Sequence, residues 1–313
     1  MTNLAPVCVF VYNRPAHTEK MLKSLKANQL FEKSEVIVFA DGIKEGANEE
    51  DLKKVNEVRN LLTHFAKNKN VTLHFSEINR GLSVSILTGI DQVLNNYGKI
   101  IVLEDDLELS PGFLQFMNEA LLEYESSEKV MHVGGYMVPN SLSLQSPLFM
   151  RAPTIWGWGT WKNKWRSAEL NPTKIIERIK DKKNENFEYE FNVRDGYPYF
   201  KLLNDIEAGK VNAWSVLWYA NIFLREGLCL MPSKSLVRNT GFDGSGENCD
   251  FTDLFLNADL LNEAELKNSL IEESEICISL FQAFWKLQSI KVRKDDHSNP
   301  TTFQRAMKIL TRN

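Results

Sequence analysis

The sequence contains few cysteines, and their spacing excludes two common kinds of site. Four cysteines occur in 313 residues, far apart and without a C-x-x-C pair: Cys8, Cys229, Cys249 and Cys277. Structural zinc sites and disulfide frameworks both depend on closely or regularly spaced cysteines. The sequence therefore predicts neither kind of site, and a reducing compartment suits the chain.

Long apolar runs and an excess of positive charge are also missing. The apolar run at residues 7–12 is too short for a signal peptide, and no stretch approaches the roughly 18 apolar residues of a membrane span. The net charge of −4 argues against a surface that binds nucleic acid. We therefore expect a cytoplasmic protein with no nucleic-acid partner.

What the chain does contain is a regular alternation of strand and helix signals up to residue 136. Apolar runs typical of strands occur at residues 7–12, 35–40, 71–75, 99–103 and 130–135. The segments between them carry apolar residues at helical spacing. This alternation predicts an α/β fold, with a mostly parallel central sheet flanked by helices.

The composition changes after residue 136, where tryptophans and charged residues become frequent. Residues 214–224 are a strongly apolar helix candidate, and the glycine-rich residues 239–250 predict a loop. We expect one domain over residues 1–250, divided near residue 136, and a helical C-terminal appendage over residues 251–313. The basic end of this appendage predicts peripheral contact with an anionic membrane surface, and the alternative is a solvated tail.

One predicted strand ends in three consecutive carboxylates, Glu104, Asp105 and Asp106. Ligands of α/β proteins gather at the carboxyl ends of parallel strands, where these side chains would emerge. Adjacent carboxylates repel each other unless a cation neutralises them, and oxygen ligands favour Mg²⁺, Mn²⁺ or Ca²⁺ over Zn²⁺. The run therefore predicts a metal-bound diphosphate site, and the alternative is a solvated acidic turn.

Three other polar residues follow predicted strands and so belong to the same rim of the sheet: Arg14, Asp41 and Arg80. Arginines can bind phosphate or stack on a base, and an aspartate can accept a hydrogen bond from a base or a ribose hydroxyl. Together with the acidic run they predict a site for a nucleoside diphosphate. Each also has a plainer interpretation: Arg14 as an arginine paired with a nearby carboxylate, Asp41 as part of a turn, and Arg80 as a surface residue.

Four of the seven tryptophans fall within residues 156–165. Flat aromatic faces bind the C–H surfaces of sugars, and the glycines between Trp156 and Trp161 allow a bent loop. We expect Trp156 and Trp158 to bind an acceptor sugar. The alternative is a core cluster beneath a long loop.

These residues resemble the nucleotide-sugar-dependent glycosyltransferases of the GT-A fold, which is Rossmann-like. The sequence is similar to the N-acetylglucosaminyltransferase I type and to bacterial family 2 enzymes over residues 5–165, and weakly over 210–245. The most specific part is residues 102–113, which look like that family's variant of the metal-binding D-x-D motif.

The resemblance implies a role for each rim residue. Asp106 would coordinate the divalent cation, and Glu104 and Asp105 would lie near the ribose and the sugar. Arg14 matches an arginine that contacts the nucleotide, and Asp41 matches an acid that recognises uracil. Residues 1–136 would then hold the nucleotide-sugar, and residues 137–250 would hold the acceptor.

One residue of the family pattern is missing. Inverting transfer needs a carboxylate that deprotonates the acceptor hydroxyl. The family places this aspartate just before a tryptophan matching Trp218, where this chain has Val216 and Leu217. The substitutes are Asp205, Glu207 and Asp243, and a retaining mechanism or weak catalysis also stays open.

The resemblance implies a metal-dependent enzyme that moves a sugar from a UDP-sugar donor to a hydroxyl of a glycan or lipid-linked acceptor. A role in bacterial surface polysaccharide synthesis would fit. One alternative is a non-catalytic protein that binds nucleotide-sugars or glycans on the same fold. A nucleotidyltransferase is disfavoured, because residues 7–18 contain no glycine for a phosphate loop.

Overall fold

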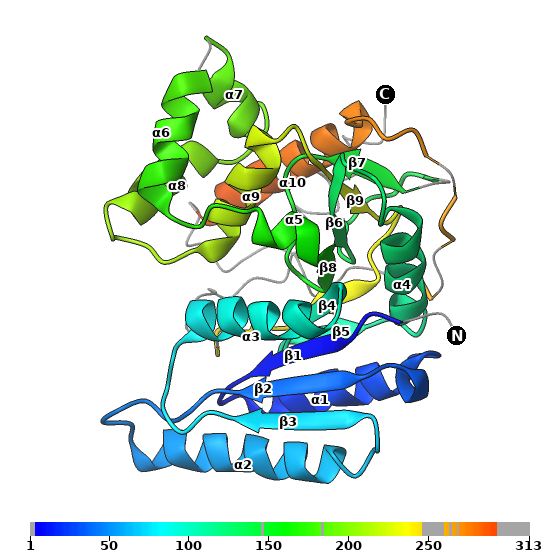
Figure 1. Ribbon diagram of the computed structural model, residues 1–313, viewed down its shortest axis with the longest axis vertical. Helices are drawn as coiled ribbons and strands as arrows, with labels where there is room; N and C mark the ends of the chain where they lie inside the picture. Colours follow the sequence, from blue (N-terminus) through cyan, green and yellow to red (C-terminus); the bar gives the residue numbers. More distant parts are fainter. Residues whose placement is uncertain are drawn as a thin grey trace.

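An eight-stranded sheet runs through the described part of the chain and carries helices on both faces (Figure 1). The computed structural model describes residues 4–144, 147–182, 185–245, 260–262, 265–267 and 269–292. The strand order is β3-β2-β1-β4-β8-β6-β9-β7. The strands are β1 (Val7–Val11), β2 (Val36–Ala40), β3 (Val71–Phe75), β4 (Lys99–Glu104), β6 (Val130–Gly134), β7 (Leu148–Met150), β8 (Trp158–Trp161) and β9 (Leu228–Met231).

The helices form one layer on each face of this sheet. One layer contains α1 (Pro15–Lys26), the 3₁₀ turn η1 (Phe31–Lys33), α2 (Glu49–Phe65) and α4 (Phe113–Glu123). The other contains α3 (Leu82–Asn96), α5 (Lys162–Arg166), α6 (Pro172–Lys182), α7 (Phe187–Phe191), α8 (Tyr199–Glu207), α9 (Trp214–Leu224) and α10 (Glu275–Val292). The expected α/β fold with a mostly parallel central sheet is confirmed.

Alternate residues of each central strand enter different cores. In β1, Val7 and Val9 pack with the layer that contains α1, whereas Cys8 and Phe10 pack with the layer that contains α3. All five residues of β1 are buried, because helices cover both faces. This double cover explains why the strands read as continuous apolar runs in the sequence.

The tryptophan-rich segment is a central strand, which the sequence analysis did not predict. β8 lies antiparallel between β4 and β6, with Val102 opposite Trp158. Trp158 and Trp161 are 0% and 1% exposed and enter opposite cores. Gly159 allows the close approach of β4, because a Cβ there would lie 2.8 Å from the carbonyl oxygen of Ile100.

A second, two-stranded sheet brings a distant segment to the end of β4. β5 (Leu107–Leu109) follows the acidic run directly and pairs antiparallel with β10 (Val237–Asn239), with Leu107 opposite Asn239. The residues after β10 are therefore placed against Glu104–Asp106. This pairing was also not predicted from the sequence.

The C-terminal helix packs on the same core as the rest of its layer. Arg194 forms an ion pair with Glu275 at the start of α10, and Gln282 donates to the carbonyl oxygen of Arg194 at 2.7 Å. The basic tail, predicted to contact a membrane, lies outside the described residues. Among the helices described, none is both long enough and apolar enough to cross a bilayer.

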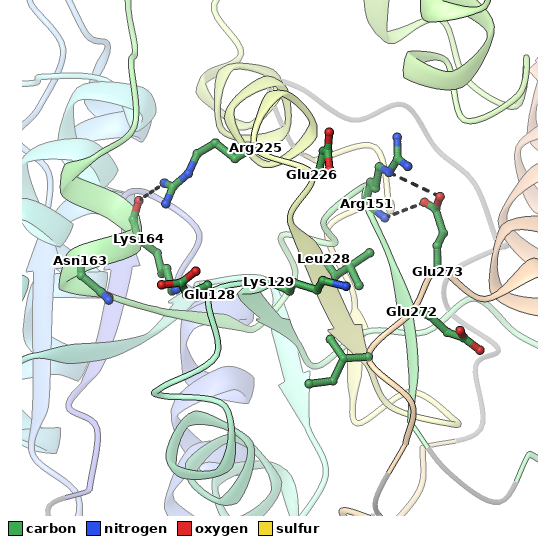
Figure 2. Close-up of a pocket in the computed structure, with 11 residues that line it drawn as sticks. Glu128, Lys129, Arg151, Asn163, Lys164, Arg225, Glu226, Leu228, Glu272 and Glu273 are labelled. Atoms are coloured by element: carbon green, nitrogen blue, oxygen red, sulfur yellow. Dashed lines mark hydrogen bonds and ion pairs between the residues drawn. The ribbon is translucent and has the colours of Figure 1, made fainter.

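The two ends of the central strands carry different polar features. The carboxyl end of β4 carries the acidic run. At the opposite end of the strands, the amino ends of β6 and β9 border a polar cavity of about 720 Å³ (Figure 2). The acidic rim and this cavity are therefore separate features of the fold.

The buried position of Trp158 predicts a large loss of stability on truncation. Trp158→Ala should lower the free energy of unfolding by about 3–5 kcal/mol, because it opens a cavity in a packed aromatic core. Urea denaturation measures this, with Leu122→Ala, at a side chain 56% exposed, as the control. A Trp158→Ala protein as stable as the wild type would contradict the core assignment.

Candidate functional site

The three consecutive carboxylates lie at the junction of β4 and β5 and are only partly exposed. Burial, reinforced by the charges of the neighbouring aspartates, raises the pKa of Glu104 to about 8. Burial, with the charge of Asp106, raises the pKa of Asp105 to about 7. The pKa of Asp106 is also raised by burial, against the opposing effect of Arg14. The rim therefore crowds three carboxyl groups whose ionisation the protein itself compensates only in part.

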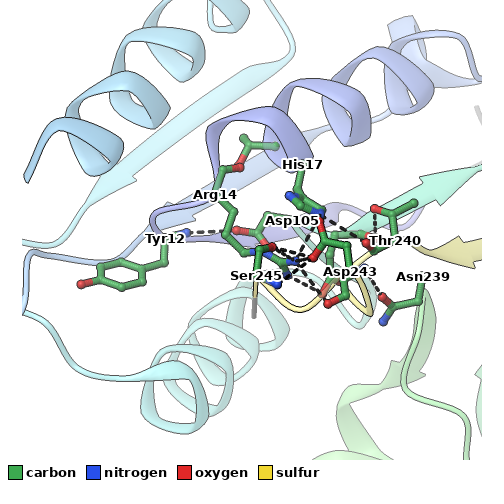
Figure 3. Close-up of polar contacts among 11 residues, drawn as sticks. Tyr12, Arg14, His17, Asp105, Asn239, Thr240, Asp243 and Ser245 are labelled. Atoms are coloured by element: carbon green, nitrogen blue, oxygen red, sulfur yellow. Dashed lines mark hydrogen bonds and ion pairs between the residues drawn. The ribbon is translucent and has the colours of Figure 1, made fainter. Parts of the chain in front are cut away.

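Arg14 provides the positive charge that meets this run (Figure 3). It is the residue before α1, and Nη1 donates to Asp106 Oδ2 at 3.0 Å. Nη2 donates to the carbonyl oxygen of Gly241 at 3.3 Å and to Ser245 Oγ at 2.9 Å. The side chain thus joins the first strand end to the acidic run and to the segment after β10.

The segment after β10, residues 240–245, is tied to the acidic run through its backbone. Both the N–H and the hydroxyl of Thr240 donate to the carbonyl oxygen of Asp106, at 2.8 and 2.9 Å. Gly241 follows, and a Cβ at this position would lie 2.1 Å from Asp106 Oδ2. Glycine is therefore required here for the carboxylate of Asp106 to sit beside Arg14.

Asp243 completes this cluster and carries a negative charge. One carboxylate oxygen lies 3.3 Å from Arg14 Nη2, and the other lies 3.1 Å from His17 Nε2. Burial acts to raise the pKa of Asp243, but hydrogen bonds from Ser245 and the charges of His17 and Arg14 lower it overall. Of the three substitutes for the missing base, Asp243 is the one that contacts Arg14.

The other two substitutes make no such contact. Asp205 on α8 pairs with Lys201 at 2.5 Å and Lys210 at 3.3 Å, and hydrogen bonds from these lysines lower its pKa. Glu207 is exposed at the end of the same helix. Within the described residues, neither side chain shares a hydrogen bond or ion pair with the acidic run or with Arg14.

Asp41 organises the turn that precedes α3. Its carboxylate accepts hydrogen bonds from the N–H groups of Gly42, Arg80 and Gly81, each at 2.9 Å. Gly42 is needed for this turn, because a Cβ there would lie 2.3 Å from the carbonyl carbon of Ile78. Asp41 therefore has a structural role in this turn, and its role toward uracil stays a prediction. The side chain of Arg80 is exposed.

The two tryptophans predicted to bind the acceptor have different positions. The prediction for Trp158 is wrong, because the side chain is fully buried and stacks on His132 with ring centroids 5.1 Å apart. Trp156 is partly exposed and contacts Tyr136 and Phe242 edge to face. Trp156 therefore lies beside the segment that carries Asp243, and its acceptor role stays a prediction.

Sequence reasoning missed His17, Thr240, Gly241 and Ser245 as members of the cluster. His17 lies in the first turn of α1, three residues after Arg14 at the N-cap, and its ring nitrogen is 3.1 Å from Arg14 Nη2. That spacing was the available signal. The other three belong to a segment predicted only as a loop, and their proximity to Asp106 depends on the pairing of β10 with β5.

The residues at the rim fit a divalent cation only in part. Among the described residues, no group of three histidine, cysteine, aspartate or glutamate side chains is arranged to hold a metal. The acidic run nevertheless offers oxygen ligands, the type that Mg²⁺ and Mn²⁺ prefer. A cation at Asp106 would therefore take further oxygens from a ligand, as it would from a diphosphate.

The raised pKa values predict that the protein loses stability as pH rises and that a bound cation restores it. Between about pH 4 and 8, folded protein binds more protons than the unfolded chain at Glu104 and Asp105, so the free energy of unfolding falls as pH rises. Mn²⁺ binding to the ionised carboxylates should raise the melting temperature at pH 8 but not at pH 5.

Thermal melts from about pH 5 to 8 test this, with and without Mn²⁺. A Glu104→Gln/Asp105→Asn double variant should show a flatter pH dependence than the wild type. A double variant with the same pH profile as the wild type would contradict the assignment.

The comparison with solved structures gives distant likenesses. S. aureus TarS 1–349 is 15% identical, with a TM-score of 0.41, over 82% of this chain and 67% of that chain. The same fragment crystallised in complex with UDP gives a TM-score of 0.42 at 15% identity, with the same coverage of both chains. An active-site mutant of LgtC is 12% identical, with a TM-score of 0.36, over 57% of this chain and 66% of that chain.

Sequence comparison assigns the family. No curated protein sequence matches the chain significantly. Residues 7–203 match the sequence model of glycosyl transferase family 2. This segment runs from β1 into α8 and contains Arg14, Asp41 and the acidic run. The chain therefore belongs to glycosyl transferase family 2.

Proposed function

We propose that the protein transfers a sugar from a UDP-sugar to a hydroxyl group of a glycan or lipid-linked acceptor, and that Mg²⁺ or Mn²⁺ assists. The observation that carries this proposal is the meeting of Arg14, Asp106 and Asp243 at the carboxyl end of β4. An enzyme that releases a diphosphate must neutralise its charge, and this rim offers both a guanidinium and oxygen ligands for a cation.

Asp106 is the proposed metal ligand, with Glu104 and Asp105 beside it. A bound cation would supply Lewis-acid stabilisation of the departing diphosphate. Arg14 would act on the same phosphates, because its guanidinium is already held at the rim by Asp106 and residues 241–245. Asp41 would hold the turn before α3 in the shape that receives the nucleoside.

Asp243 is the proposed base for the acceptor hydroxyl. Its carboxylate is ionised, is 41% exposed and belongs to the cluster around Arg14. In contrast, Val216 and Leu217, which occupy the family position, are buried in α9 at 5% and 7% exposure. The lack of a carboxylate at these two positions favours a second candidate function, a protein that binds nucleotide-sugars without catalysis.

The cellular setting belongs to the proposal as well. Assembly of a bacterial surface polysaccharide from cytoplasmic nucleotide-sugars would supply both the donor and an acceptor. The basic tail would bring the enzyme to the inner membrane face, where a lipid-linked acceptor would lie.

Nucleotide titration tests the donor site. The wild type should bind UDP in the presence of Mn²⁺, and Asp106→Asn should weaken this binding by tenfold or more, about 1.4 kcal/mol, through loss of a cation ligand. Calorimetry with UDP, GDP and CMP, each with and without Mn²⁺, measures it. Asp181→Asn, at an exposed acid on α6, is the control. Failure to bind any of the three nucleotides would overturn the proposal.

Turnover separates the two candidate functions. Asp243→Asn should lower sugar transfer or donor hydrolysis by about 10²–10⁴-fold, because it removes a general base. UDP affinity in the same variant should change far less than turnover. A wild-type protein that binds UDP but turns over no UDP-sugar would favour the binding protein. Loss of turnover in Asp205→Asn, with Asp243→Asn still active, would show that the base is assigned wrongly.

A further inference from the structure

The polar cavity of about 720 Å³ lies at the amino ends of β6 and β9, the end of the sheet opposite the acidic rim. Its walls include Lys129 before β6, Leu228 at the start of β9 and Arg151 just after β7. Because β7 and β8 run antiparallel to their neighbours, the ends of both strands meet the amino ends of β9, β6 and β4. The cavity therefore lies away from Glu104–Asp106 and the proposed donor site.

One wall of the cavity holds two positive charges without a carboxylate partner (Figure 2). Lys164 is only 5% exposed, and its ammonium donates to the carbonyl oxygen of Ser127 at 2.6 Å. Arg225 donates to the carbonyl oxygen of Lys164 at 3.3 Å and to Ser167 Oγ at 2.6 Å. Throughout the described ranges, no carboxylate lies within 4.0 Å of either cation, so only neutral oxygens satisfy them.

The surroundings of Lys164 compensate its positive charge only in part. Burial and the charge of Arg225 lower the pKa of Lys164 overall, against the opposing charge of Glu128. A buried ammonium has three donors, and one of them is used here. An anion bound between Lys164 and Arg225 would accept charge-assisted hydrogen bonds from both.

The remaining walls favour a ligand rich in hydroxyl groups. Arg151 and Glu273 pair with each other at 3.5 Å, which leaves three carboxylates on the cavity wall, Glu128 beside Lys164 and Glu226 and Glu272 farther along. Ionised carboxylates only accept hydrogen bonds, and hydroxyl groups can donate them. The volume also exceeds what a free phosphate ion needs. These features describe a site with an anion-binding end and a hydroxyl-binding body.

We propose that this cavity binds a phosphorylated sugar or polyol, with the phosphate between Lys164 and Arg225 and the hydroxyl groups toward Glu226 and Glu272. The site is independent of the proposed transfer reaction. Loss of nucleotide binding at Asp106 would leave it untouched.

Calorimetric titration with glucose 6-phosphate tests the proposal. Glucose and inorganic phosphate are titrated in parallel as the neutral sugar and the bare anion. Arg225→Gln should weaken glucose 6-phosphate binding about tenfold through loss of a charge-assisted hydrogen bond. Lys162→Gln is the control and should bind like the wild type, because Lys162 is on α5, the short helix that carries Lys164, but lies outside the cavity.

A third variant identifies where the ligand binds. Arg14→Gln should keep its affinity for glucose 6-phosphate, because Arg14 belongs to the acidic rim. Binding lost in Arg14→Gln but kept in Arg225→Gln would place the ligand at the rim and overturn the proposal. Absence of binding, or equal affinity for glucose or for inorganic phosphate, would also overturn it. Lys164→Gln should also weaken glucose 6-phosphate binding, but loss of this buried cation can affect folding. Arg225→Gln is therefore the deciding variant, because Arg225 is exposed and its substitution should leave the protein folded.

Discussion

The contact between Arg14 and Asp106 is the interaction on which the rim of this protein depends. It joins side chains 92 positions apart in the sequence, and the same guanidinium reaches the segment after β10. Three carboxylates in succession would repel each other at the end of a buried strand. One shared arginine reduces this repulsion without removing it, which leaves a charge imbalance that a metal–diphosphate ligand would correct.

The fold of residues 1–136 was largely predictable, because it follows from local sequence patterns. Strands β1, β2 and β4 lie between helices on both faces, so each of them is a continuous apolar run, and the helices show periodic apolar stripes. The parallel arrangement then places Arg14, Asp41 and Glu104 at strand ends on one rim. Those positions followed from the alternation of elements alone.

The fold of the residues after 136 was less predictable, because it depends on pairings between strands distant in sequence. β8 contains two tryptophans and a glycine in four residues, a composition that suits a binding loop as well as a buried strand. Only its position between β4 and β6 shows that Trp158 is a core residue. Likewise, Gly241 becomes significant only when β10 pairs with β5 and brings it against Asp106.

The pairing of β5 with β10 also has a consequence for the order of events during synthesis. Thr240 donates a hydrogen bond to Asp106 across a separation of 134 residues. The acidic run therefore leaves the ribosome long before residues 240–245, which pack against it. N-terminal segments generally fold first as a chain emerges, and contacts of high sequence separation form late. The parallel strands β1 to β4 can therefore assemble while the rim is still open. The hydrogen-bond partners of Arg14 at residues 241–245 become available only after those residues have been synthesised.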